Sequence, residues 1–392
     1  RPQQQLGVRG GPGRLLLTGN EAIALGALAA GCRFMTSYPM TPSTPIMEYM
    51  AAKGEALGVV VLQAEDEIAA MNMVVGAAFA GVRAMTATSG GGFCLMVEGL
   101  GLAGMTETPV VVVEGQRPGP ATGLPSRHEQ GDLEFVLHAA HGEFPRAILA
   151  PATAEEAFYL TAHAFNLAER YQTPVILLSD HYLASSYATV DSLDLQRIAV
   201  ERGALIPPGA PVSDYRRHRL TPDGISPRAI PSHPDALVVT TGDEHDEEGH
   251  ITEDAGLRNQ MVLKRLGKLE GMRREALAPQ VYGAAQPRVT LLTWGSTYGP
   301  AREAVERLNG DGVAARLVHL SQPWPLPASL AGVLGDGGKL VAVEQNATGQ
   351  MAHLLRAETG VVADGHIRRF DGRPMSPAFI VSRLKEEMAR WQ

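Results

Sequence analysis

Glu67 is the residue whose type and position most strongly indicate acid–base chemistry. It follows Glu65 and Asp66 at the start of an expected helix, and it shares one helical face with apolar side chains, namely Ala70, Met71, Val74 and Ala78. We therefore expect its carboxyl group to point inward. An inward carboxylate without a partner costs on the order of several kcal/mol and has a raised pKa, which suits proton transfer. The alternative is that three acids simply favour the positive end of the helix dipole, which explains Glu65 and Asp66 better than Glu67.

Three further segments could bind a ligand. Residues 38–45 hold three prolines that fix a turn and leave hydroxyl groups at its rim, although Ser43, Thr44 and Pro45 also suit a helix start. The glycine loop at residues 88–93 could hold an anion at a helix N-terminus, or could allow close packing instead. Arg117 follows a strand at the loop edge where α/β sheets bind ligands, so its guanidinium could bind a carboxylate or could lie on the surface.

Two other patterns resemble metal sites. Residues 335–337 read Gly-Asp-Gly, as in the metal–diphosphate motif of thiamine enzymes, but they precede a strand and indicate a simple turn. His245 and His250 lie in an acidic run that could bind a metal, yet a solvated acidic loop is the simpler interpretation. We expect no metal site in this chain.

The elements that must position these residues alternate between helix and strand. We expect helices at residues 20–30, 43–57, 65–80, 93–104 and 154–171, and strands at 34–37, 59–62, 84–88, 109–113 and 174–179. Runs of Val and Ile without polar alternation predict strands buried on both faces. A parallel sheet covered by helices is therefore the expected architecture, an α/β fold.

Four regions are expected along the chain. Residues 1–14 form an N-terminal extension, 15–190 the first α/β domain, 191–286 an extended crossing segment rich in proline, and 287–392 a smaller α/β domain. Within the last two we expect a charged helix at 258–275, strands at 288–293, 314–319 and 340–343, and helices at 299–308, 351–358 and 378–390. Because the chain begins at Arg1 and continues in a stretch rich in Pro, Gln and Gly, we also expect a processed or truncated N-terminus, which agrees with a further domain cut away ahead of it or equally with an arbitrary cut of the sequence.

Composition excludes several classes of function. The formal net charge of −8 disfavours a nucleic-acid binder, and no apolar run reaches the roughly 20 residues of a membrane helix. The two cysteines, Cys32 and Cys94, are too few for a disulfide framework or for a four-cysteine iron–sulfur cluster. We expect a cytoplasmic enzyme subunit that obtains any redox metal from a partner.

Taken together, these segments resemble the alpha subunit of the 2-oxoacid:ferredoxin oxidoreductases. The similar stretches are residues 19–22, 38–45, the Glu67 helix, 87–98, 106–109, 116–132, 240–254 and 294–296. The resemblance implies a thiamine-diphosphate-binding domain of the pyrimidine type followed by a transketolase C-terminal-like domain. It implies that Glu67 contacts the aminopyrimidine ring and promotes ylide formation, and that Thr41 and Arg117 bind the substrate, with Thr41 also near the cofactor.

The resemblance also implies what the partners supply. A beta subunit would hold the diphosphate, Mg²⁺ and a [4Fe–4S] cluster, with ferredoxin as electron acceptor, coenzyme A as acyl acceptor, and a possible gamma domain or subunit in a dimer of heteromers. Residues 116–120 and 129–132 are similar to the 2-oxoglutarate branch, which makes succinyl-CoA or runs in reverse to fix CO2. Three alternatives stay open: the same family acting on pyruvate or another 2-oxo acid, a non-redox thiamine enzyme, and a catalytically silent scaffold.

Overall fold

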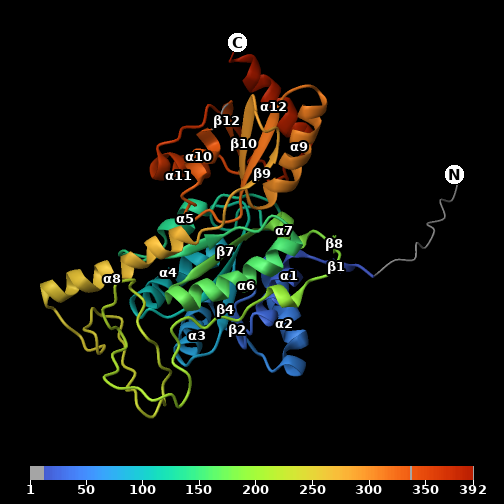
Figure 1. The fold of residues 1–392 in the computed structure, drawn as a ribbon. Helices are drawn as coiled ribbons and strands as arrows, with labels where there is room; N and C mark the ends of the chain where they lie inside the picture. Colours follow the sequence, from blue (N-terminus) through green and yellow to red (C-terminus); the bar gives the residue numbers. More distant parts are fainter. Residues whose placement is uncertain (1–12, 336–337, 392) are drawn as a thin grey trace.

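The computed structural model describes residues 13–335 and 338–391 of the chain (Figure 1). The expected extension at residues 1–14 therefore lies almost wholly outside the described residues, as do two of the three residues of the Gly-Asp-Gly motif. No helix in the described ranges is long and apolar enough to cross a membrane.

The first domain is built on a six-stranded sheet in the order β3-β2-β4-β5-β7-β6, and every pairing in it is parallel. Its strands are β2 (Phe34–Ser37), β3 (Val60–Gln63), β4 (Ala84–Thr88), β5 (Val111–Gln116), β6 (Ala147–Leu149) and β7 (Val175–Asp180). All residues of β4, β5 and β7 are buried, as expected for strands covered on both faces. The predicted parallel sheet is thus confirmed.

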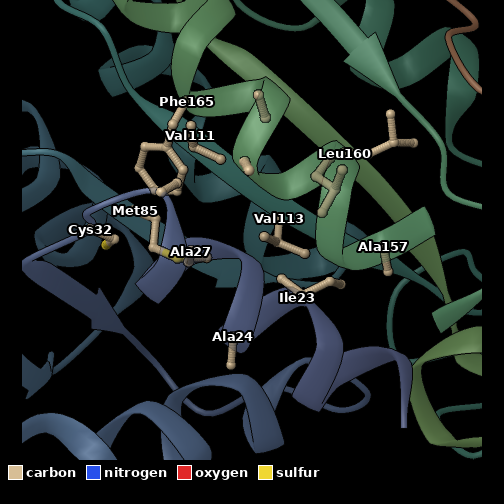
Figure 2. Close-up of a cluster of buried hydrophobic side chains, with 14 of the residues drawn as sticks. Ile23, Ala24, Ala27, Cys32, Met85, Val111, Val113, Ala157, Leu160 and Phe165 are labelled. Atoms are coloured by element: carbon tan, nitrogen blue, oxygen red, sulfur yellow. The ribbon is translucent and has the colours of Figure 1, made fainter. Parts of the chain in front are cut away.

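Helices cover both faces of this sheet (Figure 1). One face packs against α1 (Gly19–Ala29), α2 (Thr44–Leu57) and α6 (Ala154–Tyr171), and the other against α3 (Glu67–Phe79) and α4 (Gly90–Met105). Figure 2 shows the first of these cores, where Ile23 and Ala27 of α1 and Phe165 of α6 close over Val111 and Val113 of β5. Two shorter helices complete the domain: α5 (Leu133–His138) precedes β6, and α7 (His181–Ser185) directly follows β7. Strand β1 (Leu15–Leu17) pairs with β8 (Ala188–Val190).

The second sheet has five strands in the order β13-β12-β10-β11-β9. They are β9 (Gln280–Gly283), β10 (Val289–Trp294), β11 (Ala315–Leu320), β12 (Lys339–Glu344) and β13 (Gly365–Arg368), and only β9 runs antiparallel. Helices α9 (Tyr298–Gly310) and α12 (Pro377–Ala389) cover one face. On the other face, α10 (Leu330–Gly335) and α11 (Gln350–Thr359) join the core that also holds α3 and α4, so one continuous apolar cluster links the two domains.

The structure differs from the expected division of the chain at residue 287. Strand β9 pairs with β11 from Arg316↔Gly283 to His319↔Gln280, so it belongs to the second sheet although it precedes residue 287. A boundary at 287 would separate the strand from its own sheet. We therefore propose that the second domain begins at about residue 280.

The expected crossing segment contains little regular structure before residue 255. It holds the short 3-10 helix η1 (Leu195–Arg197) and then α8 (Ala255–Arg274), which agrees with the charged helix expected at 258–275. A second 3-10 helix, η2 (Gly295–Thr297), follows β10. In Figure 1 the irregular stretch loops below α8, beside the first domain.

Candidate functional site

The candidate site residues gather at the carboxyl edge of the six-stranded sheet. Residues 38–45 follow β2, Glu67 follows β3, the glycine loop follows β4, and Arg117 follows β5. Because all these strands are parallel, their carboxyl ends meet at one edge, where open α/β sheets bind ligands. Residues that lie up to 76 positions apart in the chain, such as Thr41 and Arg117, are therefore neighbours.

Glu67 is buried at the N-terminus of α3. Asp66 caps this helix by accepting a 2.7 Å hydrogen bond from the Ala69 amide, which leaves Glu67 as the first helical residue. The Glu67 side chain is 3% exposed, which confirms that it points inward, and in the described part of the chain its Oε1 atom has no hydrogen-bond partner. Burial raises the pKa of Glu67 above its usual range, its own backbone amide opposes that rise, and the charge of Asp66 adds to it.

The glycine loop packs directly on this carboxyl group. A Cβ atom added to Gly92 would lie 2.8 Å from Glu67 Cδ, and it would come closer still to Glu67 Oε1 and Thr88 Oγ1. Real Cβ atoms do not approach other atoms so closely, so a side chain at this position would displace the Glu67 carboxyl group or the Thr88 hydroxyl group. Of the two interpretations of the loop, the structure favours close packing, here against the Glu67 side chain.

Thr41 and Arg117 are in direct contact. Arg117 Nη1 donates a 2.7 Å hydrogen bond to the Thr41 carbonyl oxygen, and Arg117 is half-buried while Thr41 is exposed. The turn that carries Thr41 is fixed by helix α1, because Asn20 Nδ2 donates a 2.7 Å hydrogen bond to the Pro42 carbonyl oxygen. Thr88 Oγ1 lies 3.9 Å from Met40 Sδ, so Thr88 separates this turn from Gly92 and Glu67.

The sequence did not reveal that two carboxyl groups, those of the buried Glu114 and the half-buried Asp132, lie together beside Arg117. Glu114 of β5 is fully buried, and in the described ranges neither of its oxygens has a donor. Burial raises its pKa well above the usual range, the neighbouring Asp132 adds to the rise, and Arg117 opposes it. Burial raises the pKa of Asp132 to about 6. The available signal for Glu114 was an acid that directly follows the apolar run 109–113, which already indicated a strand buried on both faces.

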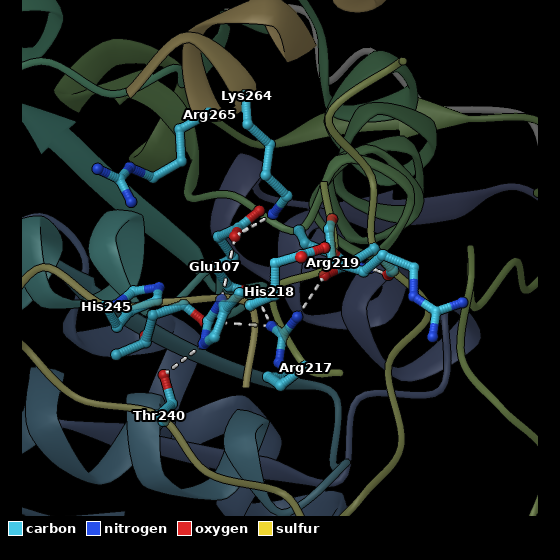
Figure 3. Close-up of polar contacts among 12 residues, drawn as sticks. Glu107, Arg217, His218, Arg219, Thr240, His245, Lys264 and Arg265 are labelled. Carbon is cyan, nitrogen blue, oxygen red and sulfur yellow. Dashed lines mark hydrogen bonds and ion pairs between the residues drawn. The ribbon is translucent and has the colours of Figure 1, made fainter. Parts of the chain in front are cut away.

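His245 does not lie in a solvated loop, contrary to the expectation. It is fully buried and stacks on His218 with 3.9 Å between ring centroids, whereas the side chain of His250 is 65% exposed. Figure 3 shows His245 and His218 beside Glu107, the one group of three possible metal ligands in the described residues. The burial follows from tertiary contacts between the crossing segment and the first domain, which the local sequence does not show.

This cluster suits an ion-pair network better than a metal ion. Lys264 and Lys268 of α8 both contact the Glu107 carboxylate, and Arg217 Nη2 donates to the Glu107 carbonyl oxygen at 2.7 Å. Although burial opposes ionisation, Lys268 and Lys264 hold the pKa of Glu107 well below its usual range. A divalent cation would have to displace these ammonium groups, so we interpret the cluster as the anchor of α8 on the first domain.

Two family models match the chain. The model described as pyruvate flavodoxin/ferredoxin oxidoreductase, thiamine diP-binding, matches residues 25–264, and the transketolase C-terminal domain model matches residues 281–378. The first match covers more than half of the chain and includes Thr41, Glu67, Arg117, Glu114 and Asp132. The second covers the five-stranded sheet through β13.

Curated relatives extend the similarity along the whole chain. The 2-oxoacid:ferredoxin oxidoreductase 1 subunit alpha of Sulfurisphaera tokodaii is 42% identical over 96% of this chain, and the chain spans 61% of that relative's length. The 2-oxoglutarate synthase subunit KorA of Methanothermobacter thermautotrophicus is 34% identical over 94% of this chain and 97% of the relative.

Solved structures agree with these matches. The 2-oxoglutarate:ferredoxin oxidoreductase from Magnetococcus marinus, with 2-oxoglutarate, coenzyme A and succinyl-CoA bound, superposes with a TM-score of 0.92 at 37% identity, over 96% of this chain and 66% of that one. A split-gene transketolase has a TM-score of 0.53 at 13% identity, and that likeness concerns the fold alone.

Proposed function

Because the chain belongs to the alpha subunits of the 2-oxoacid:ferredoxin oxidoreductase family, we propose that it carries part of the active site for the oxidative decarboxylation of 2-oxoglutarate. The products would be succinyl-CoA, CO2 and two electrons for ferredoxin. The observation that carries this proposal is the buried carboxyl group of Glu67 at the carboxyl edge of the six-stranded sheet, whose Oε1 atom has no hydrogen-bond partner in the described part of the chain.

The residues at this edge fit thiamine diphosphate. Glu67 presents an oxygen without a hydrogen-bond partner in the described part of the chain, and burial raises its pKa, which favours a carboxyl group that can hold a proton as well as release it. Gly92 keeps the space beside that oxygen clear of side chains. When bound, thiamine diphosphate supplies the electron sink for decarboxylation. The chain's own contribution is to set the protonation of Glu67 Oε1 and to keep it in a fixed place.

Arg117 and Thr41 are proposed to bind the substrate carboxylate. The guanidinium carries five N–H donors, and the bond to the Thr41 carbonyl uses one of them, so others remain for a planar carboxylate. The exposed Thr41 side chain adds a hydroxyl group at the same place. This pair would orient a negatively charged 2-oxo acid at the carboxyl edge of the sheet.

A beta subunit is proposed to supply the diphosphate site, Mg²⁺ and the iron–sulfur cluster. The 392 residues contain two cysteines, fewer than the four that a [4Fe–4S] cluster requires. The chain also exposes apolar residues next to Glu67: Val60 and Leu62 on the edge strand β3 are 59% and 43% exposed, and Ile68 of α3 is 50% exposed. An exposed apolar edge of this kind suits a protein partner.

Support for 2-oxoglutarate comes from the relatives named 2-oxoglutarate synthase and from the neighbour bound to 2-oxoglutarate. The test is to co-purify the chain with its native partner and measure coenzyme-A-dependent viologen reduction with 2-oxoglutarate and pyruvate in parallel. We expect a higher kcat/KM with 2-oxoglutarate. A preference for pyruvate would correct the substrate. A complex that contains thiamine diphosphate but no iron, and that reduces no dye, would favour a non-redox enzyme.

A further inference from the structure

The second domain holds the backbone of residues 128–134, at the end of the long loop that begins at Arg117. Along residues 128–134, the amide of His128 donates to the Gly372 carbonyl at 3.1 Å and the amide of Gln130 donates to the Gln345 carbonyl at 2.8 Å. The amide of Glu134 donates to Gln350 Oε1 at 3.0 Å. Three backbone donors of this segment are therefore paired with residues more than 200 positions away in the chain.

Backbone acceptors of the same segment are paired in the same way. Asn346 Nδ2 donates to the Gln130 carbonyl at 3.1 Å, and Gln350 Nε2 donates to the Gly131 carbonyl at 2.6 Å. Side-chain amides of Asn346 and Gln350 thus replace the pairing that a neighbouring strand would give. Since these contacts go to the backbone, they fix the path of the segment.

The side chain of Asn346 is itself held in one orientation. It is 1% exposed, its Nδ2 also donates to Glu344 Oε2 at 3.0 Å, and its Oδ1 accepts from the Gly349 amide at 2.7 Å. Glu344 is fully buried and accepts from the amides of Met351 and Ala352 at the start of α11. The helix N-terminus stabilises this carboxylate. The Asn346 donor that reaches residue 130 is therefore preorganised.

Residues 130–132 also contact the strand ends and the glycine loop of the candidate site. The amide of Asp132 donates to Gln116 Oε1 at 3.1 Å, and Gln116 directly precedes Arg117. Gln130 Nε2 donates to Asp180 Oδ2 at 3.0 Å, and Asp180 pairs in register with Gln116 across β5 and β7. Asp132 also packs on the glycine loop, because its Oδ2 lies 2.8 Å from the place of a Cβ atom on Gly90. Residues 130–132 therefore connect the second domain with the strand ends that carry Arg117.

We propose that Gln350 and Asn346 are positioning residues for substrate binding, which act on Arg117 through residues 130–132. The proposal rests on the proposed function, because it takes Arg117 as the group that binds the substrate carboxylate. It assigns the second domain a task at the active site, although the described candidate site residues all lie in the first domain. It also predicts that the effect falls on KM rather than on the chemical step, since neither amide reaches Glu67.

The test compares Gln350→Met with wild type in the complex with the native partner. Methionine keeps the length of the side chain but removes both bonds to the backbone of residues 131 and 134. Arg356→Met, at an exposed position on the same helix, is the matched control. We expect Gln350→Met to raise the KM for 2-oxoglutarate roughly fivefold, with kcat within about twofold of wild type. Amide hydrogen exchange should become faster in residues 128–134 and in the peptide that contains Arg117, and Arg356→Met should change neither measurement.

The double variant Gln350→Met with Arg117→Lys shows whether Gln350 changes the KM through Arg117 or independently of it. If Gln350 acts through Arg117, the double variant should have a KM close to that of Arg117→Lys alone. Multiplied effects would contradict the proposal, as would an unchanged KM despite faster exchange. If the wild-type complex oxidises no 2-oxo acid, the proposed function fails, and hydrogen exchange then decides this inference alone. Faster exchange confined to residues 128–134, without a change at Arg117, would refute it.

Discussion

Replacing Gly92 with alanine tests the packing of the Glu67 carboxyl group. The added Cβ atom would lie 2.8 Å from Glu67 Cδ and closer to Glu67 Oε1 and Thr88 Oγ1, a space that no real Cβ atom shares. Both neighbours are buried, so they can move only at a cost, which for overpacking is about 1 to 3 kcal/mol. The displaced carboxyl group should also lose its function, and we expect activity in the assembled complex to fall at least about tenfold.

Gly91 provides a matched control for the stability measurement. It lies one position earlier in the same helix, it is exposed, and a Cβ atom there would have no neighbour within 4 Å. Gly91→Ala should therefore stabilise the isolated chain by about 0.5 to 1 kcal/mol, because alanine favours the helix. Urea unfolding of both variants gives the comparison. The reasoning is refuted if Gly92→Ala is as stable as Gly91→Ala and keeps wild-type activity.

Three further predictions concern Asp132, Glu107 and Arg117. Burial raises the pKa of Asp132 from 3.8 to about 6, so the folded chain binds this proton more tightly than the unfolded chain, and the free energy of unfolding falls as the pH rises from about 4 to about 6. When the free energy of unfolding is measured by urea at a series of pH values, Asp132→Asn should remove on the order of 2 kcal/mol of its decrease between about pH 4 and 6. An unchanged dependence on pH would contradict a raised pKa for Asp132. Glu107→Gln leaves two buried lysines without their carboxylate, so the free energy of unfolding should fall by about 3 to 5 kcal/mol and proteolysis of the crossing segment should become faster. A fall below about 1 kcal/mol would show that the network does not anchor α8. Arg117→Lys removes the planar fork and should raise the KM for the 2-oxo acid about tenfold in the assembled complex, whereas an unchanged KM would exclude Arg117 as the carboxylate ligand.

The family, the fold class and most elements were predictable from the sequence. The chain belongs to the predicted family, and both predicted domain types are confirmed by the matching family models. Helix α6 was predicted with its observed bounds, Ala154–Tyr171, because its apolar face repeats over five turns and Thr153 caps it. The burial of Glu67 followed from the same helical periodicity. The roles of Glu67, Thr41 and Arg117 remain proposals.

The features that sequence reasoning missed depend on contacts between distant segments. Strand β9 has only four residues, three of them exposed, so its local pattern gives little sign of a strand. Asp132 and Glu114 meet only because a loop 16 residues beyond β5 returns to that strand's end. His245 lies in an acidic run that indicates a solvated loop, and its burial comes from packing on His218 beside Glu107. Hydrophobic periodicity carries no information about any of these contacts.

The most direct test of the account is the activity of Glu67→Gln in the complex with the native partner, measured as coenzyme-A-dependent viologen reduction with 2-oxoglutarate. Glutamine keeps the shape of the side chain but cannot take up or release the proton. Glu65→Gln makes the same change at an exposed position two residues earlier. We predict that Glu67→Gln lowers kcat by about 100-fold or more while the chain unfolds at the wild-type temperature or above, and that Glu65→Gln leaves kcat unchanged. A Glu67→Gln complex with kcat within about twofold of wild type would contradict the central claim that this buried carboxyl group performs the acid–base step.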